Sequence, residues 1–333
     1  MRRHIPLLFC MACLALVSMV ALSGCVGQEK TGGPQYKNDV ITIEDYYVSN
    51  LKPYAGSEAT MEFLVQNNGE HPVKRVTVSF FDTSGLTVKI LKCSGEEIPL
   101  SDESRPTCVF GESEALVAIE PLDVRQVVLR LGMPSDSVIK KPTSFTVSYR
   151  IEYDYSGYRK ADLPVVDGVT VRTASSKYSQ STPSYGPIRL DFEMPVRGEH
   201  KEGTQTVKEY WGVRDEPFEV VFKLTDVADS KLKDKTPIIA AGNLMLDAKG
   251  SLARADGLPC DFCKPGETGC MGTDSKYLYL GKDAKVPSEL RCSFRSYDFI
   301  EPETFATLWA QYNYTYGYTL TEKFEVQPVG EAG

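Results

Sequence analysis

The chain has 333 residues, a formal charge of −8, 42% hydrophobic residues and 10% aromatic residues. This composition supports packed cores and argues against global disorder, and the length suffices for two ordinary domains. The acidic balance argues against nucleic acid as a partner, because it leaves no basic surface for a polyanion.

The N-terminal segment has the layout of a secretory signal. Arg2 and Arg3 precede an almost wholly apolar run at 5–21, and small residues follow it. An uncleaved signal anchor is the alternative, because roughly 17 apolar residues lie at the short limit for a membrane-spanning helix.

The tetrapeptide Leu22-Ser23-Gly24-Cys25 closes this segment and resembles the lipobox of bacterial and archaeal lipoproteins. In that family the cysteine becomes the lipidated first residue of the mature protein. The resemblance implies that the signal peptide, 1–24, is removed and that Cys25 carries lipid. The chain would then be anchored at the outer face of the cell membrane.

After the lipidated cysteine, the stretch 25–39 is polar and contains Gly32-Gly33-Pro34, so we expect a flexible tether. Short runs with alternating apolar and polar residues follow, at 59–65, 76–80, 86–93, 122–131 and 145–155. Each run has the period of a β-strand. Ser156-Gly157 predicts a turn, from which the segment 158–166 would pair back.

Strands this short, with no helical period between them, predict an all-β fold. Residues 169–186 are rich in serine and threonine and are interpreted as a connection. The second half repeats the pattern of the first, with an alternating run at 218–224 and a tyrosine-rich run at 312–318. This repeat predicts two tandem immunoglobulin-like β-sandwich domains, at 40–168 and 187–329.

The segment 57–82 consists of an alternating run, the sequence Asn67-Asn68-Gly69 and a second alternating run. It resembles the start of the CARDB-type immunoglobulin-like domains of archaeal and bacterial surface proteins. That family is associated with adhesion and surface scaffolding, so the resemblance implies a binding role and supplies no catalytic residues. The second half departs from the pattern at 225–229.

The cysteines agree with export. Of nine, two lie in the signal segment and one would be lipidated, which leaves an even number in the folded body. Disulfides are the default for such a chain. Cys93 and Cys108, about 15 residues apart, are predicted to pair. The remaining four allow three pairings and are Cys260, Cys263, Cys270 and Cys292.

The repeat makes Cys292 the counterpart of Cys108, which favours a backward pairing with Cys260 or Cys270. A zinc site is the alternative, because Cys260 and Cys263 have the spacing of zinc ligands. The matching second pair is missing from the sequence, so we expect disulfides, with no metal and no cofactor.

Seven tyrosines are candidates for contacting a partner, because tyrosine gives a large contact area at low entropic cost. They are Tyr153, Tyr155, Tyr158, Tyr312, Tyr314, Tyr316 and Tyr318. We favour the alternative that strand alternation buries one row of them and that cross-strand pairing explains the rest. Asn313 begins an Asn-Tyr-Thr sequence, which is an acceptor for N-glycosylation.

Catalytic motifs are missing from the sequence, and the mature chain has only His71 and His200, both expected to be solvated. Asp226, Asp229 and Asp234 lack the spacing of a calcium-binding loop and are interpreted as a solvated turn.

We therefore expect a non-enzymatic lipoprotein that serves adhesion, scaffolding or partner binding, with surface proteins, envelope proteins or glycans as partners. The alternative is a ligand-binding or hydrolytic lipoprotein with a site at the junction of the two domains. A polar pocket around His200 would favour that alternative.

Overall fold

The computed structural model describes residues 36–100, 105–111, 118–194, 196–229, 231–236, 238–240, 244–250, 252–254, 261–263, 277–279, 288–296 and 301–329. All regular structure in these ranges is β, so the all-β prediction is confirmed. The described part of the chain has no helix with the length and hydropathy of a membrane span. The predicted signal peptide, the lipobox and Cys25 lie outside the described residues.

The first sheet has five strands, and its central strands match the alternating runs of the sequence. Every second residue of β2 is buried, as a strand packed on one face requires. In sheet order the strands are β1 (Ile41–Val48), β2 (Glu58–Asn67), β7 (Val124–Gly132), β4 (Thr87–Cys93) and β5 (Glu96–Ile98).

The second sheet is the largest and includes strands from both halves of the sequence. Its main path is β19 (Tyr277–Tyr279), β15 (Ile238–Ala240), β21 (Glu303–Val326), β8 (Thr143–Val166), β3 (Arg75–Asp82) and β6 (Thr107–Phe110). Three further strands join it: β16 (Leu244–Gly250) pairs with β21, while β9 (Ser179–Gln180) and β13 (Gly212–Val213) pair with β8.

The third sheet is built from the second half of the chain alone. It contains β10 (Ile188–Glu193), β14 (Pro217–Asp226), β20 (Ser288–Ser296) and β17 (Leu252–Arg254), and β18 (Asp261–Cys263) also pairs with β20. A separate two-stranded hairpin is formed by β11 (Val196–Glu202) and β12 (Gln205–Tyr210).

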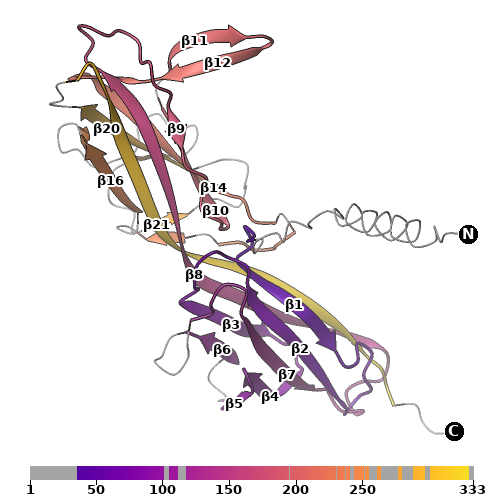
Figure 1. The fold of residues 1–333 in the computed structure, drawn as a ribbon. Coiled ribbons are helices and arrows are strands. Elements are labelled where there is room, and N and C mark those ends of the chain that lie inside the picture. The colour runs from indigo at the N-terminus through magenta and orange to yellow at the C-terminus, as the bar shows by residue number, and fades with distance from the viewer. Residues whose placement is uncertain are drawn as a thin grey trace, which may run out of the picture. The chain divides into compact units, whose positions relative to one another are not determined.

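The dominant feature of the fold is the antiparallel ladder between β8 and β21 (Figure 1). Both strands are 24 residues long and pair along their whole length. The turn predicted at Ser156-Gly157 is wrong, because β8 continues through these residues without reversing. The segment 158–166 pairs with the start of β21 and not with 145–155.

The two long strands, β8 and β21, hold equivalent places in the sequence repeat. The C-terminal half of each strand pairs with the N-terminal half of the other. The first half of β8 pairs with β3, and the first half of β21 pairs with β16. The second half of each strand continues beside the first half of the other. Strands from both predicted ranges, 40–168 and 187–329, therefore share one sheet, and their independence as domains stays a prediction.

The packing of β21 against β8 explains why a glycine stands inside the ladder. Gly157 lies opposite Tyr312, and a Cβ added at Gly157 would lie 2.3 Å from Cζ of that ring. Tyr312 is fully buried, and its hydroxyl donates to the Ile188 carbonyl at 3.0 Å. The ring is thus held in place over the glycine, which is the usual reason for a glycine within a strand.

Gly157→Ala is expected to lower the free energy of unfolding by about 1–3 kcal/mol, the cost of overpacking a filled core. Urea titration followed by circular dichroism measures the change. Ser156→Ala is the matched control, because Ser156 is the neighbouring, half-buried residue on the other face of β8. A Gly157→Ala variant as stable as this control would contradict the account.

One disulfide connects the first two sheets. Cys93 at the end of β4 and Cys108 in β6 are bonded, with a Cα–Cα distance of 5.7 Å, so the predicted pair is confirmed. Phe63 of β2 and Tyr149 of β8 also pack across this interface, with ring centroids 5.2 Å apart. The sheets therefore enclose a common core, and its buried residues form one cluster that extends into the second half.

Candidate functional site

Six of the seven candidate tyrosines are buried, so these six are not available as contacts for a partner. Each of the six is at most 4% exposed: Tyr153, Tyr155, Tyr312, Tyr314, Tyr316 and Tyr318. They occupy the inner row of the β8–β21 ladder, where Tyr153 packs on Tyr316 and Tyr155 packs on Tyr314. Strand alternation therefore buries this row, as the alternative interpretation had it.

Three of the buried hydroxyls, those of Tyr312, Tyr316 and Tyr318, donate hydrogen bonds within the fold. Tyr318 donates to the Ile41 carbonyl at 2.8 Å, which fixes the start of β1 to the second half of β21. Burial raises the pKa of Tyr312 to about 12, so this hydroxyl stays protonated and able to donate. These tyrosines act as structural anchors.

Tyr158 is the exception, and it lies in a surface cluster that we call the Tyr158 patch. The patch consists of Tyr36, Glu70, His71, Tyr158 and Tyr185. Tyr158 is 38% exposed and Tyr185 is 45% exposed. The His71 ring lies 5.9 Å from the Tyr158 ring, and the Tyr36 ring lies 6.0 Å from the Tyr185 ring.

Glu70 joins the two parts of the patch. Its Oε1 accepts a hydrogen bond from the Tyr185 backbone N–H at 3.1 Å and lies 3.5 Å from His71 Nε2. The Tyr158 backbone N–H donates to Ser184 Oγ at 2.9 Å, so the connection carrying Tyr185 is fixed to β8. The patch is thus held on the most extensively paired strand of the fold.

The patch brings together segments that the sequence keeps apart. His71 follows β2, Tyr185 precedes β10, and Tyr36 belongs to the stretch expected to be a tether. The close approach of these segments needs glycine: a Cβ at Gly69 would lie 2.5 Å from the Tyr155 hydroxyl oxygen. No periodic pattern marks Tyr36 or Tyr185, so only long-range packing assigns them to a common surface.

His200 lines a cavity, which is a feature expected of the alternative function, a ligand-binding or hydrolytic lipoprotein. The cavity measures about 340 Å³ and lies between residues 174–178 and the β11–β12 hairpin. It is not at a junction of the two predicted domains, because its walls come from the predicted connection and from the second half. It is lined by Ala174, Ser175, Ser176, Lys177, Tyr178, His200, Val207, Lys208, Glu209, Tyr210 and Trp211.

The His200 imidazole is held between two carboxylates. Its Nε2 lies 3.1 Å from Glu202 Oε1, and its Nδ1 lies 2.9 Å from Glu209 Oε1. The hydrogen bond with Glu202 and the charge of Glu209 raise the pKa of His200 above its ordinary value. The side chain is 43% exposed, so it is solvated, as the sequence predicts, and is also paired.

The opposite wall is fixed by Glu303 at the start of β21. Its carboxylate accepts hydrogen bonds from Ser175 Oγ at 2.7 Å and from the backbone N–H groups of Ser175 and Ser176, each at 2.8 Å. Partial burial raises the pKa of Glu303, but these hydrogen bonds outweigh it and lower the pKa to about 2. The Ser175 hydroxyl donates to Glu303 and not to His200, so these two residues lack the hydrogen bond of a nucleophile–base pair.

A buried ion pair lies at the end of β14 and corrects the interpretation of Asp226 as part of a solvated turn. The side chain of Asp226 is 4% exposed, and its Oδ2 lies 3.3 Å from Lys235 Nζ. The Tyr316 hydroxyl and the Ala228 backbone N–H both donate to this carboxylate. Asp229 is exposed, as a turn residue is expected to be.

The remaining site predictions concern four cysteines, a possible metal site and Asn313. Cys292 is disulfide-bonded, which removes it from any four-cysteine zinc site, while the side chains of Cys260, Cys263 and Cys270 lie outside the described residues. The described residues contain no cluster of three or more side chains suited to a metal ion. Asn313 is half-buried on β21, and its glycosylation stays a prediction.

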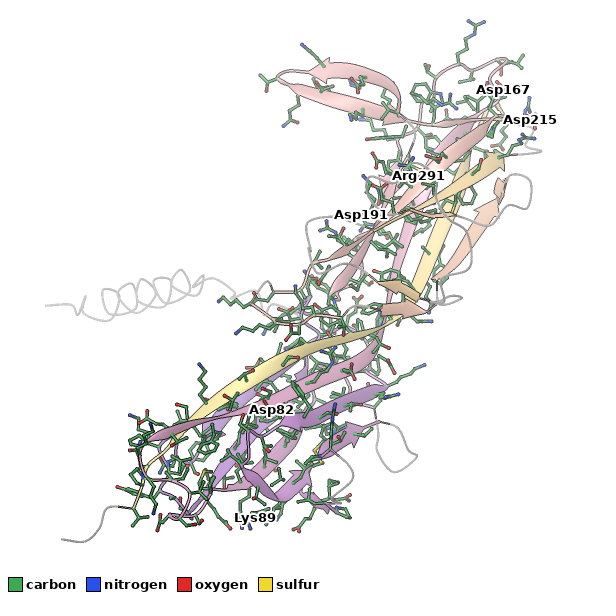
Figure 2. The ribbon with its side chains drawn as sticks, turned by 180° about the vertical axis from the view of Figure 1, so that it is seen from behind. Asp82, Lys89, Asp167, Asp191, Asp215 and Arg291 are labelled. Carbon is green, nitrogen blue, oxygen red and sulfur yellow. A yellow bond between two sulfur atoms is a disulfide. The ribbon has the colours of Figure 1, made fainter. Side chains whose placement is uncertain are left out.

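Figure 2 shows the fold with its side chains and labels Asp167 and Asp191. Asp167 follows β8 at the end of the fold from which the β11–β12 hairpin projects, and Asp191 lies on β10. The hydrogen bond from Thr170 Oγ1 and those from the backbone N–H groups of 169–171 lower the pKa of Asp167 to about 2. These bonds order the chain where it leaves β8 toward the cavity wall.

Comparisons with known proteins give low similarities. No family model and no curated protein matches the chain. Escherichia coli alpha-2-macroglobulin activated by porcine elastase is 9% identical, with a TM-score of 0.16, and the alignment covers 86% of this chain and 32% of that chain. This chain thus spans about one third of that protein's length.

Two adhesins are also similar. The collagen adhesin from S. aureus is 9% identical, with a TM-score of 0.14, and 90% of this chain and 91% of that chain are covered. The Enterococcus faecalis MSCRAMM ACE, which binds its ligands by the collagen Hug model, is 12% identical, with a TM-score of 0.13, covering 88% and 97%. At these TM-scores the similarities assign neither a fold family nor a function to this chain.

Proposed function

We propose that this protein is a non-enzymatic surface lipoprotein, anchored through Cys25, that binds another envelope protein through the Tyr158 patch. The observation that carries the proposal is the clustering of exposed aromatic rings around Glu70 on the β8–β21 ladder. The CARDB-like resemblance of 57–82 and the lipobox-like tetrapeptide support the surface location.

The chemistry of the patch suits protein recognition. Tyrosine rings bury a large area with few rotatable bonds, so contacts through Tyr158 and Tyr185 lose little side-chain entropy on binding. Aromatic residues of this kind are enriched among the residues that dominate binding energy. The hydrogen bonds from Tyr158 and Tyr185 to Ser184 and Glu70 hold the two backbones in place before a partner arrives.

Photo-crosslinking on intact cells tests the proposal. A photoreactive phenylalanine analogue at position 185 is expected to capture one reproducible protein neighbour, identified by mass spectrometry. The same analogue at Tyr54, which is 59% exposed outside the patch, is the matched control. Capture of the same neighbour from both positions, or only self-contacts from position 185, would overturn the proposal.

A separate measurement tests the anchor. Intact-mass analysis of the mature protein is expected to show loss of 1–24 and a lipid adduct on Cys25, and Cys25→Ser is expected to release the protein from membranes. Retention of 1–24 without lipid would reject the lipoprotein assignment. The crosslinking experiment would still test partner binding separately.

A further inference from the structure

The cavity beneath the β11–β12 hairpin combines an aromatic wall with a charged rim. The rings of Tyr178 and Tyr210 lie 5.2 Å apart and are tilted by 53°. Trp211 also lines the cavity and is 8% exposed. A volume of about 340 Å³ lies in the range of small-molecule sites, roughly 300–1,000 Å³.

A glycine in β11 leaves room for the side chains of Glu209 and Trp211. Gly198 of β11 pairs with Glu209, and a Cβ at Gly198 would lie 2.8 Å from Glu209 Oε2 and 3.2 Å from Trp211 Cη2. Because the glycine leaves this space free, both side chains lie close to β11. The cavity is therefore built by the pairing of the hairpin.

The rim presents cations from both sides of the cavity. Lys177 comes from the connection before β9, and Lys208 comes from β12. His200 adds a third cationic group at moderately acidic pH, because its carboxylate partners favour the charged form. Glu209 is the anion in the lining, and Glu202 beside His200 also attracts Lys177. His200 is held between Glu202 and Glu209, so Lys177 and Lys208 are the cations of the lining that remain for an anionic ligand.

A ligand for this cavity needs an apolar face, hydroxyl groups and a negative charge. A pyranose ring with a carboxylate has all three: its C–H face packs on the aromatic rings, and its hydroxyls donate to the Glu209 carboxylate. The carboxylate forms charge-assisted hydrogen bonds with the two lysines. Flat aromatic ligands lack the hydroxyls, and cationic ligands would face Lys177 and Lys208.

We propose that the hairpin cavity binds a uronic acid residue, a pyranose sugar with a carboxylate at C6. This site is separate from the Tyr158 patch, so the two proposals stand or fall independently. As a glycan site it gives the protein a second mode of attachment to surface material.

Tryptophan fluorescence tests the inference, because the chain has two tryptophans and Trp309 lies on β21, outside the cavity lining. In a Trp309→Phe variant, Trp211 is the sole reporter. D-glucuronate and D-galacturonate are the probes, and D-glucose and D-galactose are their matched controls, differing only at C6. We expect a saturable change with at least one uronate, at a Kd on the order of 1 mM, and binding at least about tenfold weaker for the matching hexose.

The lysine requirement separates a built site from general charge attraction. Lys177→Ala and Lys208→Ala are each expected to weaken uronate binding by at least about threefold. Lys201→Ala, an exposed change on β11 outside the lining, is expected to leave it unchanged. Saturation-transfer NMR on the unsubstituted protein repeats the measurement without the Trp309 change. Absence of saturable binding by both uronates, equal binding of the hexoses, or equal loss with Lys201→Ala would overturn the inference.

Discussion

Replacing Asp226 with alanine is expected to lower the free energy of unfolding by about 3–5 kcal/mol, the cost of breaking a buried ion pair. The Lys235 ammonium would lose its carboxylate partner at 3.3 Å, with a side chain only 11% exposed. The Tyr316 hydroxyl and the Ala228 N–H would lose their acceptor as well. Urea titration followed by circular dichroism measures the change.

Two further variants separate this effect from a general loss of packing. Asp229→Ala, at an exposed position three residues away, is expected to cost less than about 1 kcal/mol. A triple variant, Asp226→Leu, Lys235→Met and Tyr316→Phe, removes the three polar side chains together and leaves only the Ala228 N–H without its acceptor. It is expected to recover most of the lost stability. A triple variant no more stable than Asp226→Ala would contradict the ion-pair explanation.

Removing the Cys93–Cys108 disulfide is expected to cost about 3 kcal/mol, because the crosslink restricts a loop of roughly 15 residues in the unfolded chain. The bond also joins two sheets, β4 in the first and β6 in the second, so its loss acts on the whole interface between them. The double variant Cys93→Ala, Cys108→Ala is compared with the unsubstituted protein by thermal and urea unfolding.

The matched control for the disulfide is Glu97→Ala, an exposed residue of β5, which is expected to change stability by less than about 0.5 kcal/mol. If the double variant unfolds at the same urea concentration as this control, the disulfide does not stabilise the fold. Mass spectrometry under non-reducing conditions verifies that the bond is present in the unsubstituted protein.

Local signals predicted β2, β7 and β4, the three central strands of the first sheet. Ala59, Met61, Phe63 and Val65 form the buried row of β2. A strand with one buried face can be predicted from its own sequence, because its buried residues recur with a period of two. The Cys93–Cys108 pair was equally accessible, because the two residues lie close in sequence and in an exported chain. Strand alternation and this disulfide both involve residues that are close together in the sequence.

The candidate site was predicted less well, because exposure is decided by distant strands. Tyr155 and Tyr158 look alike in sequence, yet Tyr155 faces Tyr314 in the core and Tyr158 lies at the surface beside His71. Tyr185 lies in the serine-rich connection, where no sequence pattern marked it as a candidate. The cavity combines residues 174–178 with a hairpin that begins about 20 residues later, and no motif links them.

The amino-acid sequence alone determined the all-β class, the three central strands of the first sheet and one disulfide, because strand periodicity and short cysteine spacing are local properties. It also indicated an internal repeat. The tertiary structure alone decided how the two halves of the repeat pair. β8 runs straight through Ser156-Gly157 and pairs with β21 there, and the ring of Tyr312 fills the place where a side chain at position 157 would stand. That pairing joins residues far apart in the chain, so it buries six tyrosines and leaves Tyr158 exposed.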